Sequence, residues 1–244
     1  MIKAKKKKWF LSLFHTYTTF WLFKRSFSSI SIRVDEEYDQ SKPLLLMANH
    51  SSWWDGMIAV LLSKHQIKHQ EFVMMNENGL QNYPFFKFLG AYSINTRKPK
   101  DVIQSLSYTT ELLKKNNAVW IFPQGEETPL EKRPLHFHSG VGWICKNSSH
   151  ELQLAPVTFS YLFLAEQRPR LYIHLGKSVR NTYANDDKRS ITNILETTLT
   201  QQLDEQRQQL IDQDFHTYRP LLNGNRSVSD WFQFLSKKKE QKNK

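Results

Sequence analysis

The chain has 244 residues, of which 39% are hydrophobic and 13% aromatic, so it is long enough for one large domain with a sizeable core and too apolar for a disordered protein. Its single cysteine, Cys145, excludes an internal disulfide and any zinc site built from several cysteines, and we interpret it as an ordinary core residue. The net charge of +11 indicates a polyanionic partner, which is either a nucleic acid or an anionic membrane surface.

Much of the positive charge lies in two clusters close to the ends of the chain. Residues 3–8 read KAKKKK, and residues 237–244 read KKKEQKNK. Lysine-rich ends of this kind suit an anionic membrane surface, and no recognised nucleic-acid-binding motif accompanies them. We therefore expect an anionic membrane surface as a partner and no nucleic acid.

An aromatic run, WFLSLFHTYTTFWLF, occupies residues 9–23 directly after the first lysine cluster. It is shorter than the roughly 20 apolar residues that a membrane-spanning helix needs, and the KRSFSS that follows is a poor signal-peptide cleavage site. Its aromatic residues and leucines recur near helical spacing, which predicts an amphipathic helix that lies in the membrane interface. The alternative is an amphipathic helix packed on the protein's own core.

After this segment, short apolar runs alternate with helical patterns, which predicts an α/β fold with a central sheet. Strands are expected at Leu44–Ala48, Phe72–Met75, Ala91–Ile94, Ala118–Phe122, Leu152–Phe159 and Arg170–Leu175. Helices are expected at Met57–Ser63, Tyr83–Leu89, Val102–Lys115, Val141–Lys146 and about 187–213. The sequence contains no internal repeat and no glycine-rich phosphate loop.

His50 and Asp55 lie at the break between the first strand and the first helix of this pattern. On one continuous helix, residues five apart point about 140° away from each other and do not meet. The two side chains meet if His50 ends the strand and Asp55 lies in the first turn of the helix, where Ser52 is a suitable N-cap. A buried histidine beside a capping aspartate needs no chemistry, and this pair alone favours that structural interpretation.

Three further blocks change the interpretation of this pair. The four blocks are NHSSWWD at 49–55, GLQNYPFFKFLGAYSINTR at 79–97, IFPQGEETP at 121–129 and LAPVTFSY at 154–161. In this order and spacing they resemble the motifs of the phospholipid/glycerol acyltransferase superfamily, which includes the 1-acylglycerol-3-phosphate acyltransferases. The resemblance covers roughly residues 44–177.

This resemblance implies a glycerol-3-phosphate acyltransferase-like fold, in which helices flank a mostly parallel central sheet. It implies an enzyme that moves a fatty acyl group from acyl-CoA or acyl-carrier protein to the hydroxyl of a lysophospholipid or glycerolipid, with no metal or bound cofactor. We divide the chain into a basic and aromatic membrane-associating segment (1–30), the acyltransferase domain (31–222) and a C-terminal helix with a basic tail (223–244). We expect a peripheral or monotopic protein on the cytoplasmic face of the membrane.

The chemistry of acyl transfer also explains the first block. A hydroxyl is almost un-ionised at neutral pH, so its attack on a thioester needs a base, and a histidine such as His50 suits this role. Asp55 would hold the other ring N–H, which sets the tautomer and stabilises the imidazolium. Because a thioester is already activated, no covalent acyl-enzyme is required and Cys145 has no catalytic part.

The third block departs from the family pattern, which has glutamate in place of Gln124 and threonine–arginine–serine in place of EET at 126–128. The resemblance implies that this block contacts the acceptor, with the arginine close to its phosphate. Carboxylates there would repel a phosphate unless Arg97 or Arg133 compensated, so a polyol or sugar hydroxyl is the predicted acceptor. The candidate acceptor-binding residues are Arg97, Gln124, Gly125, Glu126 and Arg133.

Two alternatives stay open. The altered third block also suits an acyltransferase for a glycosylated lipid, such as a glycosyl carotenoid. A non-catalytic membrane-surface binding protein would keep the fold without the chemistry, and the intact His50–Asp55 pair favours the enzyme over it. His136 and His138 alternate in an extended stretch, but no cysteine lies near them, so we interpret them as surface or substrate-cleft residues and predict no metal site.

Overall fold

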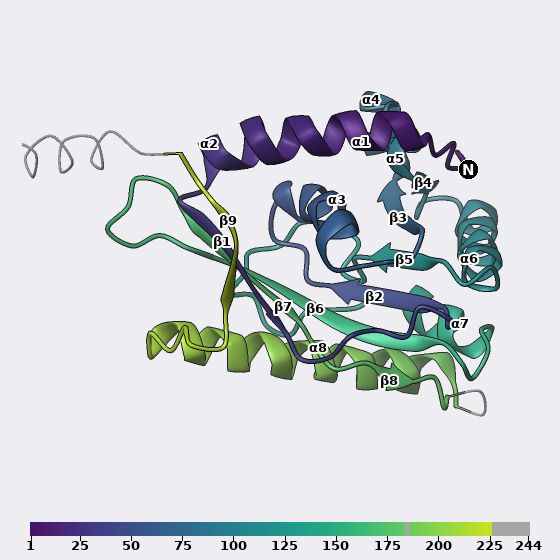
Figure 1. Ribbon diagram of the computed structural model, residues 1–244. Coiled ribbons are helices and arrows are strands. Elements are labelled where there is room, and N and C mark those ends of the chain that lie inside the picture. The colour runs from purple at the N-terminus through teal and green to yellow at the C-terminus, as the bar shows by residue number, and fades with distance from the viewer. Residues whose placement is uncertain (184–185, 226–244) are drawn as a thin grey trace, which may run out of the picture.

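A nine-stranded sheet runs through the middle of the molecule, and helices cover both of its faces (Figure 1). The computed structural model describes residues 1–183 and 186–225. Their strands are β1 (Ser29–Val34), β2 (Leu44–Ala48), β3 (Glu71–Asn76), β4 (Ala91–Ile94), β5 (Ala118–Ile121), β6 (Gln153–Leu162), β7 (Arg170–Leu175), β8 (Val179–Arg180) and β9 (Arg219–Asn223). Their helices are α1 (Lys8–Tyr17), the π-helical η1 (Thr18–Phe23), α2 (Lys24–Ser26), α3 (Trp54–His65), α4 (Glu77–Asn82), α5 (Phe86–Leu89), α6 (Pro99–Leu113), α7 (Gly140–Lys146) and α8 (Lys188–Ile211).

The order of the strands places β2 and β5 side by side near the centre. The order across the sheet is β4-β3-β5-β2-β6-β7-β1-β9, and β8 pairs with β6. The strands from β4 to β6 pair in parallel, whereas β7 is antiparallel to β6 and β9 is antiparallel to β1. The predicted mostly parallel sheet flanked by helices is confirmed. Because neighbouring parallel strands end at the same edge, the loops after β2 and β5 lie next to each other.

All six predicted strands are present within a few residues of their expected bounds, and α8 follows as the predicted long polar helix. The strands β1, β8 and β9 are additional to those that the pattern predicts. Two of them have only a weak strand pattern in the sequence, because β8 has two residues and β9 is an edge strand that contains Pro220.

The predicted helix Tyr83–Leu89 is wrong in its extent, since α4 ends at Asn82 and the short helix α5 begins only at Phe86. Pro84 explains the break, because a proline ring disfavours helical backbone at the residue before it. Tyr83 accordingly has φ −125° and ψ 68°. The predicted C-terminal helix and tail (223–244) lies outside the described residues except for 223–225, where Asn223 ends β9.

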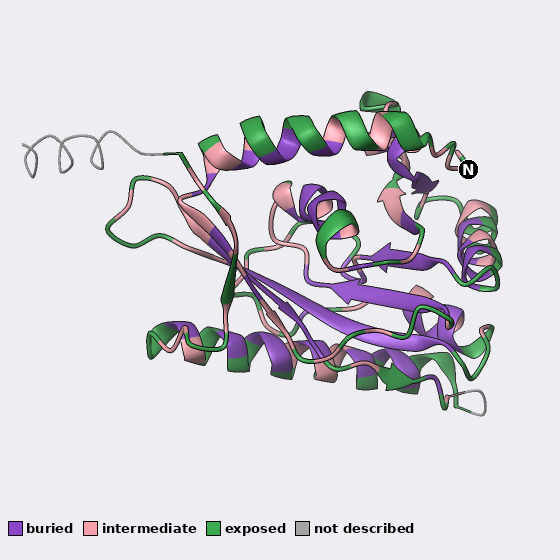
Figure 2. Cartoon of the chain, in the orientation of Figure 1, coloured by how far each residue is buried: buried purple, intermediate pink, exposed green. Residues whose placement is uncertain are grey.

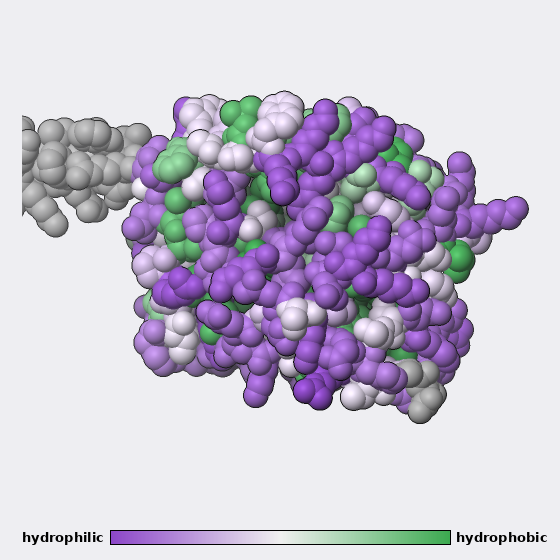
Figure 3. Space-filling model, turned by 45° about the vertical axis from the view of Figure 1, so that its right-hand side comes forward, coloured by the Kyte–Doolittle hydropathy of each residue, from purple (hydrophilic) through white to green (hydrophobic). Residues whose placement is uncertain are grey.

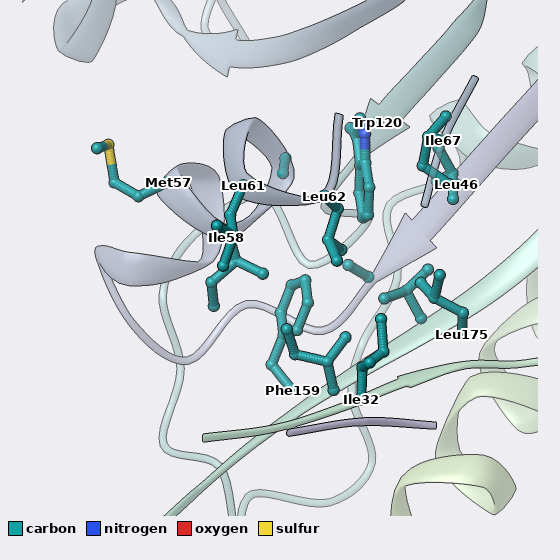
Figure 4. Close-up of a cluster of buried hydrophobic side chains, with 14 of the residues drawn as sticks. Ile32, Leu46, Met57, Ile58, Leu61, Leu62, Ile67, Trp120, Phe159 and Leu175 are labelled. Atoms are coloured by element: carbon teal, nitrogen blue, oxygen red, sulfur yellow. The ribbon is translucent and has the colours of Figure 1, made fainter. Parts of the chain in front are cut away.

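The core lies on both faces of the central strands, as the continuous burial of the sheet shows (Figure 2). Side chains alternate between the two faces of a strand. In β2, Leu44 and Leu46 belong to the cluster under α3, and Leu45 and Met47 belong to the cluster with α6, α7 and α8. Burial on both faces explains why β2 reads as a continuous apolar run rather than as an alternating one. Figure 4 shows α3 directing Ile58, Leu61 and Leu62 into the first cluster.

The segments α1, η1 and α2 follow one another without a break and are called the N-terminal helix (residues 8–26). This helix lies over α3, which therefore has the sheet on one side and the N-terminal helix on the other (Figure 1). Phe23 at its end is fully buried in the same core as α3. Residues 1–7 extend beside β4, where Ser93 N–H donates to the Ile2 carbonyl over 2.9 Å and Lys6 Nζ donates to the Glu71 carbonyl over 2.6 Å. These hydrogen bonds therefore hold part of the first lysine cluster (residues 3–8) against the domain.

The described residues include no helix that is both long enough and apolar enough to cross a membrane. On the face drawn in Figure 3, hydrophilic residues predominate and hydrophobic residues form small separate groups. The larger exposed apolar side chains include five on the N-terminal helix, each between 48% and 64% exposed: Trp9, Leu13, Tyr17, Phe20 and Trp21.

Candidate active site

The loop between β2 and α3 brings His50 and Asp55 together. His50 lies two residues after the end of β2, and Asp55 lies in the first turn of α3. The His50 Nδ1 atom is 2.9 Å from Asp55 Oδ2. Trp53, rather than the predicted Ser52, occupies the N-cap position, although the Ser52 hydroxyl still accepts from the Trp54 N–H over 3.3 Å.

Asp55 is fully buried, and its carboxylate is surrounded by hydrogen-bond donors. Besides His50, Oδ2 accepts the backbone N–H groups of Ser51 and Ser52 over 2.7 and 2.9 Å. Oδ1 accepts the Tyr161 hydroxyl over 2.5 Å. An ionised carboxylate accepts and does not donate, so in the neutral form of the His50 ring the proton lies on Nδ1 and Nε2 carries the lone pair.

The loop after β5 holds the backbone of His50 on both sides. The His50 N–H donates to Gln124 Oε1 over 2.7 Å, and the Thr128 N–H donates to the His50 carbonyl over 2.9 Å. The other end of the Gln124 amide donates to the Thr128 hydroxyl. Gln124 is buried, lines no part of the cavity beside His50, and holds His50 through its backbone N–H.

Gly125 and Phe122 shape the other side of the imidazole. The Phe122 ring stacks on His50 with 4.5 Å between ring centroids. Gly125 has φ +78°, which favours glycine, and a Cβ there would lie 2.7 Å from the His138 ring. His138 is therefore packed over the glycine of the third block.

A cavity of about 630 Å³ opens beside His50 and Gly125 and continues between the sheet and the helices. Most of its lining is apolar and comes from distant parts of the chain, including Met57, Val60, Met75, Phe86, Leu106 and Ile144. Met57, which belongs to the buried cluster drawn in Figure 4, also lines the cavity. Among the described residues, no lysine or arginine lines the cavity, and Glu127 is its one carboxylate. The cavity is in the size range of a small-molecule site.

The sequence model for the family described as Acyltransferase matches residues 29–160, more than half of the chain. The chain belongs to the acyltransferase family. Among solved structures, its fold is similar to the crystal structure of the 1-acyl-sn-glycerophosphate (LPA) acyltransferase, PlsC, from Thermotoga maritima. The TM-score is 0.56 and the identity 14%, over 81% of this chain and 78% of that chain. No curated protein sequence is significantly similar to the chain.

The remaining predicted acceptor-binding residues of this acyltransferase lie outside the cavity. Arg133 directs its guanidinium to Asp204, with Nη2 2.6 Å from Oδ1. Arg97 is exposed, next to Thr96, which lines the cavity from the end of β4. Glu126 is exposed and does not contribute to the lining. Of the five candidates, the structure brings only Gly125 into the cavity wall beside His50.

Two residues outside the list of candidate site residues lie against the His50–Asp55 pair. Glu127 has Oε1 3.6 Å from His50 Nε2, and Tyr161 holds the far oxygen of Asp55. Glu127 belongs to the third block (121–129) and Tyr161 to the fourth (154–161). Cys145 is fully buried in the core, where burial raises the pKa of its thiol to about 12. The described residues contain no group of three or more side chains arranged to hold a metal ion.

Proposed function

We propose that this acyltransferase moves a fatty acyl group from a thioester, acyl-CoA or acyl-carrier protein, to a lipid hydroxyl of the lysophospholipid or glycerolipid type. One observation carries the proposal. The Nδ1 atom of His50 is paired with Asp55, so the Nε2 atom receives no hydrogen bond from the described part of the protein. Nε2 faces a largely apolar cavity of about 630 Å³. A base, a partner that sets its tautomer and room for an acyl chain are the requirements of the reaction.

The proposed reaction balances without a cofactor. His50 Nε2 takes the proton of the acceptor hydroxyl while its oxygen attacks the thioester carbonyl carbon and a C–O bond forms. Asp55 stabilises the imidazolium that results. The C–S bond then breaks, the imidazolium returns the proton to the departing sulfur, and the products are the ester and the free thiol.

The apolar part of the cavity is the proposed site of the acyl chain. Hydrocarbon that leaves water gains roughly 25 cal/mol per Å² of apolar surface, so a methionine- and leucine-lined cavity favours a long chain over a short one. Met57 and Met75 are among its walls, and methionine adapts to irregular chains because its side chain has several rotatable bonds.

We also propose that the protein binds an anionic membrane as a peripheral or monotopic protein on its cytoplasmic face. The exposed side chains Trp9, Leu13, Tyr17 and Phe20 recur every three or four residues, so they share one face of the N-terminal helix. Lys24 Nζ lies 5.3 Å from the centroid of the Phe20 ring, so cations flank this face. Aromatic residues beside cations suit the headgroup region of a membrane.

The proposal is tested with purified protein, a radiolabelled long-chain acyl thioester and vesicles that contain candidate acceptor lipids. The expected result is release of one thiol for each acyl-lipid formed, and no product from a folded His50→Ala protein. The same assay with acyl-CoA and with acyl-carrier protein identifies the donor. A folded protein that binds vesicles but acylates no lipid hydroxyl with either donor would support the non-catalytic alternative and reject this function.

A further inference from the structure

The carboxylate of Glu127 faces the reactive nitrogen of His50. Its Oε1 atom lies 3.6 Å from His50 Nε2, on the side of the ring opposite to Asp55, and its side chain is 57% exposed. Asp55 already accepts four hydrogen bonds and is fully buried, so it has no capacity for a substrate. Glu127 is therefore the carboxylate that a bound acceptor meets.

The position of Glu127 is set by the backbone around it. Its neighbour Thr128 donates its N–H to the His50 carbonyl, and Gln124 at the start of the same loop accepts the His50 N–H. Both contacts join the loop directly to the residue that carries the base. These contacts fix the position of the Glu127 backbone relative to His50.

The two groups that face the acceptor are both hydrogen-bond acceptors. With its proton on Nδ1, the neutral imidazole offers a lone pair at Nε2, and the Glu127 carboxylate offers only lone pairs. Two acceptors form no hydrogen bond with each other, and His50 Nε2 and Glu127 Oε1 are 3.6 Å apart. Two hydroxyls on neighbouring carbons of one molecule would supply the two missing donors, one to each atom.

We propose that Glu127 determines the acceptor of the acyltransferase by accepting a hydrogen bond from a second hydroxyl, next to the one that His50 deprotonates. The acceptor is then a lipid with a neutral polyhydroxyl headgroup, of the glycerol or sugar type, and a phosphate monoester at this position is disfavoured. The inference rests on the function proposed above and concerns its acceptor.

The charges around the cavity support this choice. A phosphate monoester carries nearly two negative charges at neutral pH and would lie beside the Glu127 carboxylate. The Arg133 guanidinium is already paired with Asp204. Arg97 follows β4, which is three strand positions from β2 and hence about 14 Å away across the sheet. Within the described residues, neither arginine forms an ion pair with Glu127.

The test compares three acceptors with one saturating acyl thioester: a monoacylglycerol with two adjacent hydroxyls, a long-chain monohydric alcohol and lysophosphatidic acid. The wild-type protein, Glu127→Gln, Glu127→Arg and the surface control Glu37→Gln are assayed for kcat and KM. We expect the wild type to prefer the monoacylglycerol. In Glu127→Gln, kcat/KM for the monoacylglycerol should fall about 10- to 100-fold, mainly through KM, with little change for the monohydric alcohol. Glu127→Arg should gain activity on lysophosphatidic acid.

Each other outcome has a defined meaning. Equal losses for the monoacylglycerol and the monohydric alcohol in Glu127→Gln would overturn the inference, because Glu127 would then act on the reaction rather than on a second hydroxyl. Preference of the wild type for lysophosphatidic acid would also overturn it while leaving the proposed function intact. Failure of the wild type on all lipid acceptors would reject the proposed function itself. Glu37, whose side chain is 91% exposed, shows whether loss of one surface charge matters by itself.

Discussion

The hydroxyl of Tyr161 donates a hydrogen bond to Asp55 over 2.5 Å, from a strand 106 residues further along the chain. Burial raises the pKa of Tyr161, and the neighbouring Asp55 carboxylate raises it further, so the phenol stays protonated and continues to donate. The Tyr161 ring also stacks on Phe27 at the end of the N-terminal helix, with 6.2 Å between centroids. Tyr161 thus links Asp55, the hydrogen-bond partner of His50, to the rest of the fold.

Tyr161→Phe should reduce kcat without unfolding the protein. Phenylalanine keeps the packing against Phe27 but leaves Oδ1 of the buried Asp55 without its donor. Because hydrogen bonds to charged groups contribute more than neutral ones, we expect kcat to fall about 10-fold and KM to change little. The measurement is steady-state kinetics with a thermal-unfolding control, and an unchanged kcat would show that Tyr161 has no positioning role.

His50→Ala should abolish acyl transfer and leave the fold intact. Loss of a general base typically removes roughly 10²–10⁴ in rate. Asp55→Asn should also lose most activity, since an amide in this place favours the wrong tautomer of the imidazole. Wild-type-like turnover by a folded His50→Ala protein would contradict the mechanism. Circular dichroism and unfolding curves establish whether each variant is folded.

Local sequence reasoning was enough to bring His50 and Asp55 together, because the pair lies within six residues at a strand-to-helix junction. It was not enough for Tyr161, which reaches Asp55 only through the parallel pairing of β2 with β6. It also treats Glu126 and Glu127 alike, as two carboxylates that repel a phosphate, and includes only Glu126 among the acceptor-binding candidates. Which of two adjacent loop side chains faces a cavity depends on the loop's backbone, and a motif does not contain that information.

In the fold, too, the sequence predicts features that depend on neighbouring residues better than those that depend on distant ones. The buried strand β2 was predicted with its observed bounds, because burial on both faces produces a continuous apolar run. The strand β1 reads SISIRV and pairs with β7 and β9, both of them far along the chain. Its place in the sheet follows from those pairings rather than from its own short pattern.

Replacing Trp9, Leu13 and Phe20 by glutamine should release much of the protein from anionic vesicles. These side chains are exposed, so the substitutions remove membrane contact without opening the core. Deleting residues 1–25 is a weaker test, since it also removes the fully buried Phe23. Co-sedimentation with vesicles at two salt concentrations measures the effect, and the intact protein should bind less in high salt.

The matched control for this membrane prediction replaces Ile103, Ile194 and Ile211 by glutamine. These residues are also exposed but lie on α6 and α8. If both triple variants bind vesicles as the wild type does, the N-terminal helix is not the membrane contact. If both lose binding equally, the contact depends on total surface hydrophobicity rather than on the helix.

Acidification should weaken the packing of the N-terminal helix on α3. The ring centroids of His15 and His65 are 5.4 Å apart, and burial, Lys64 and His65 lower the pKa of His15. A histidine whose pKa is lowered by folding takes up its proton more readily in the unfolded chain. The stability that it contributes is therefore complete above about pH 6.5 and is lost as the pH falls through the lowered pKa.

His15→Leu should reduce this loss of stability. Denaturant unfolding at pH 7.5 and pH 5.0 compares the variant with the wild type, and the variant should lose less free energy of unfolding between the two values. The pKa of His174 is also lowered, chiefly by burial, so some dependence on pH persists in the variant. His216→Gln, which changes a side chain that is 76% exposed, serves as the control and should behave as the wild type does.

Gly56 offers a way to fill the proposed acyl-chain site without disturbing the fold. It lies in the first turns of α3, lines the cavity, and a Cβ added there meets no atom within 4 Å. Gly56→Leu should therefore fold at least as well as the wild type, because glycine inside a helix costs about 0.5–1 kcal/mol. Its side chain would occupy space beside His50, so kcat/KM for long-chain thioesters should fall roughly 10-fold or more while shorter donors are used better. Gly56→Ala is the matched control, which gains helix stability but occupies little of the cavity. A chain-length profile unchanged by leucine, in a protein of unchanged or higher melting temperature, would place the acyl chain elsewhere.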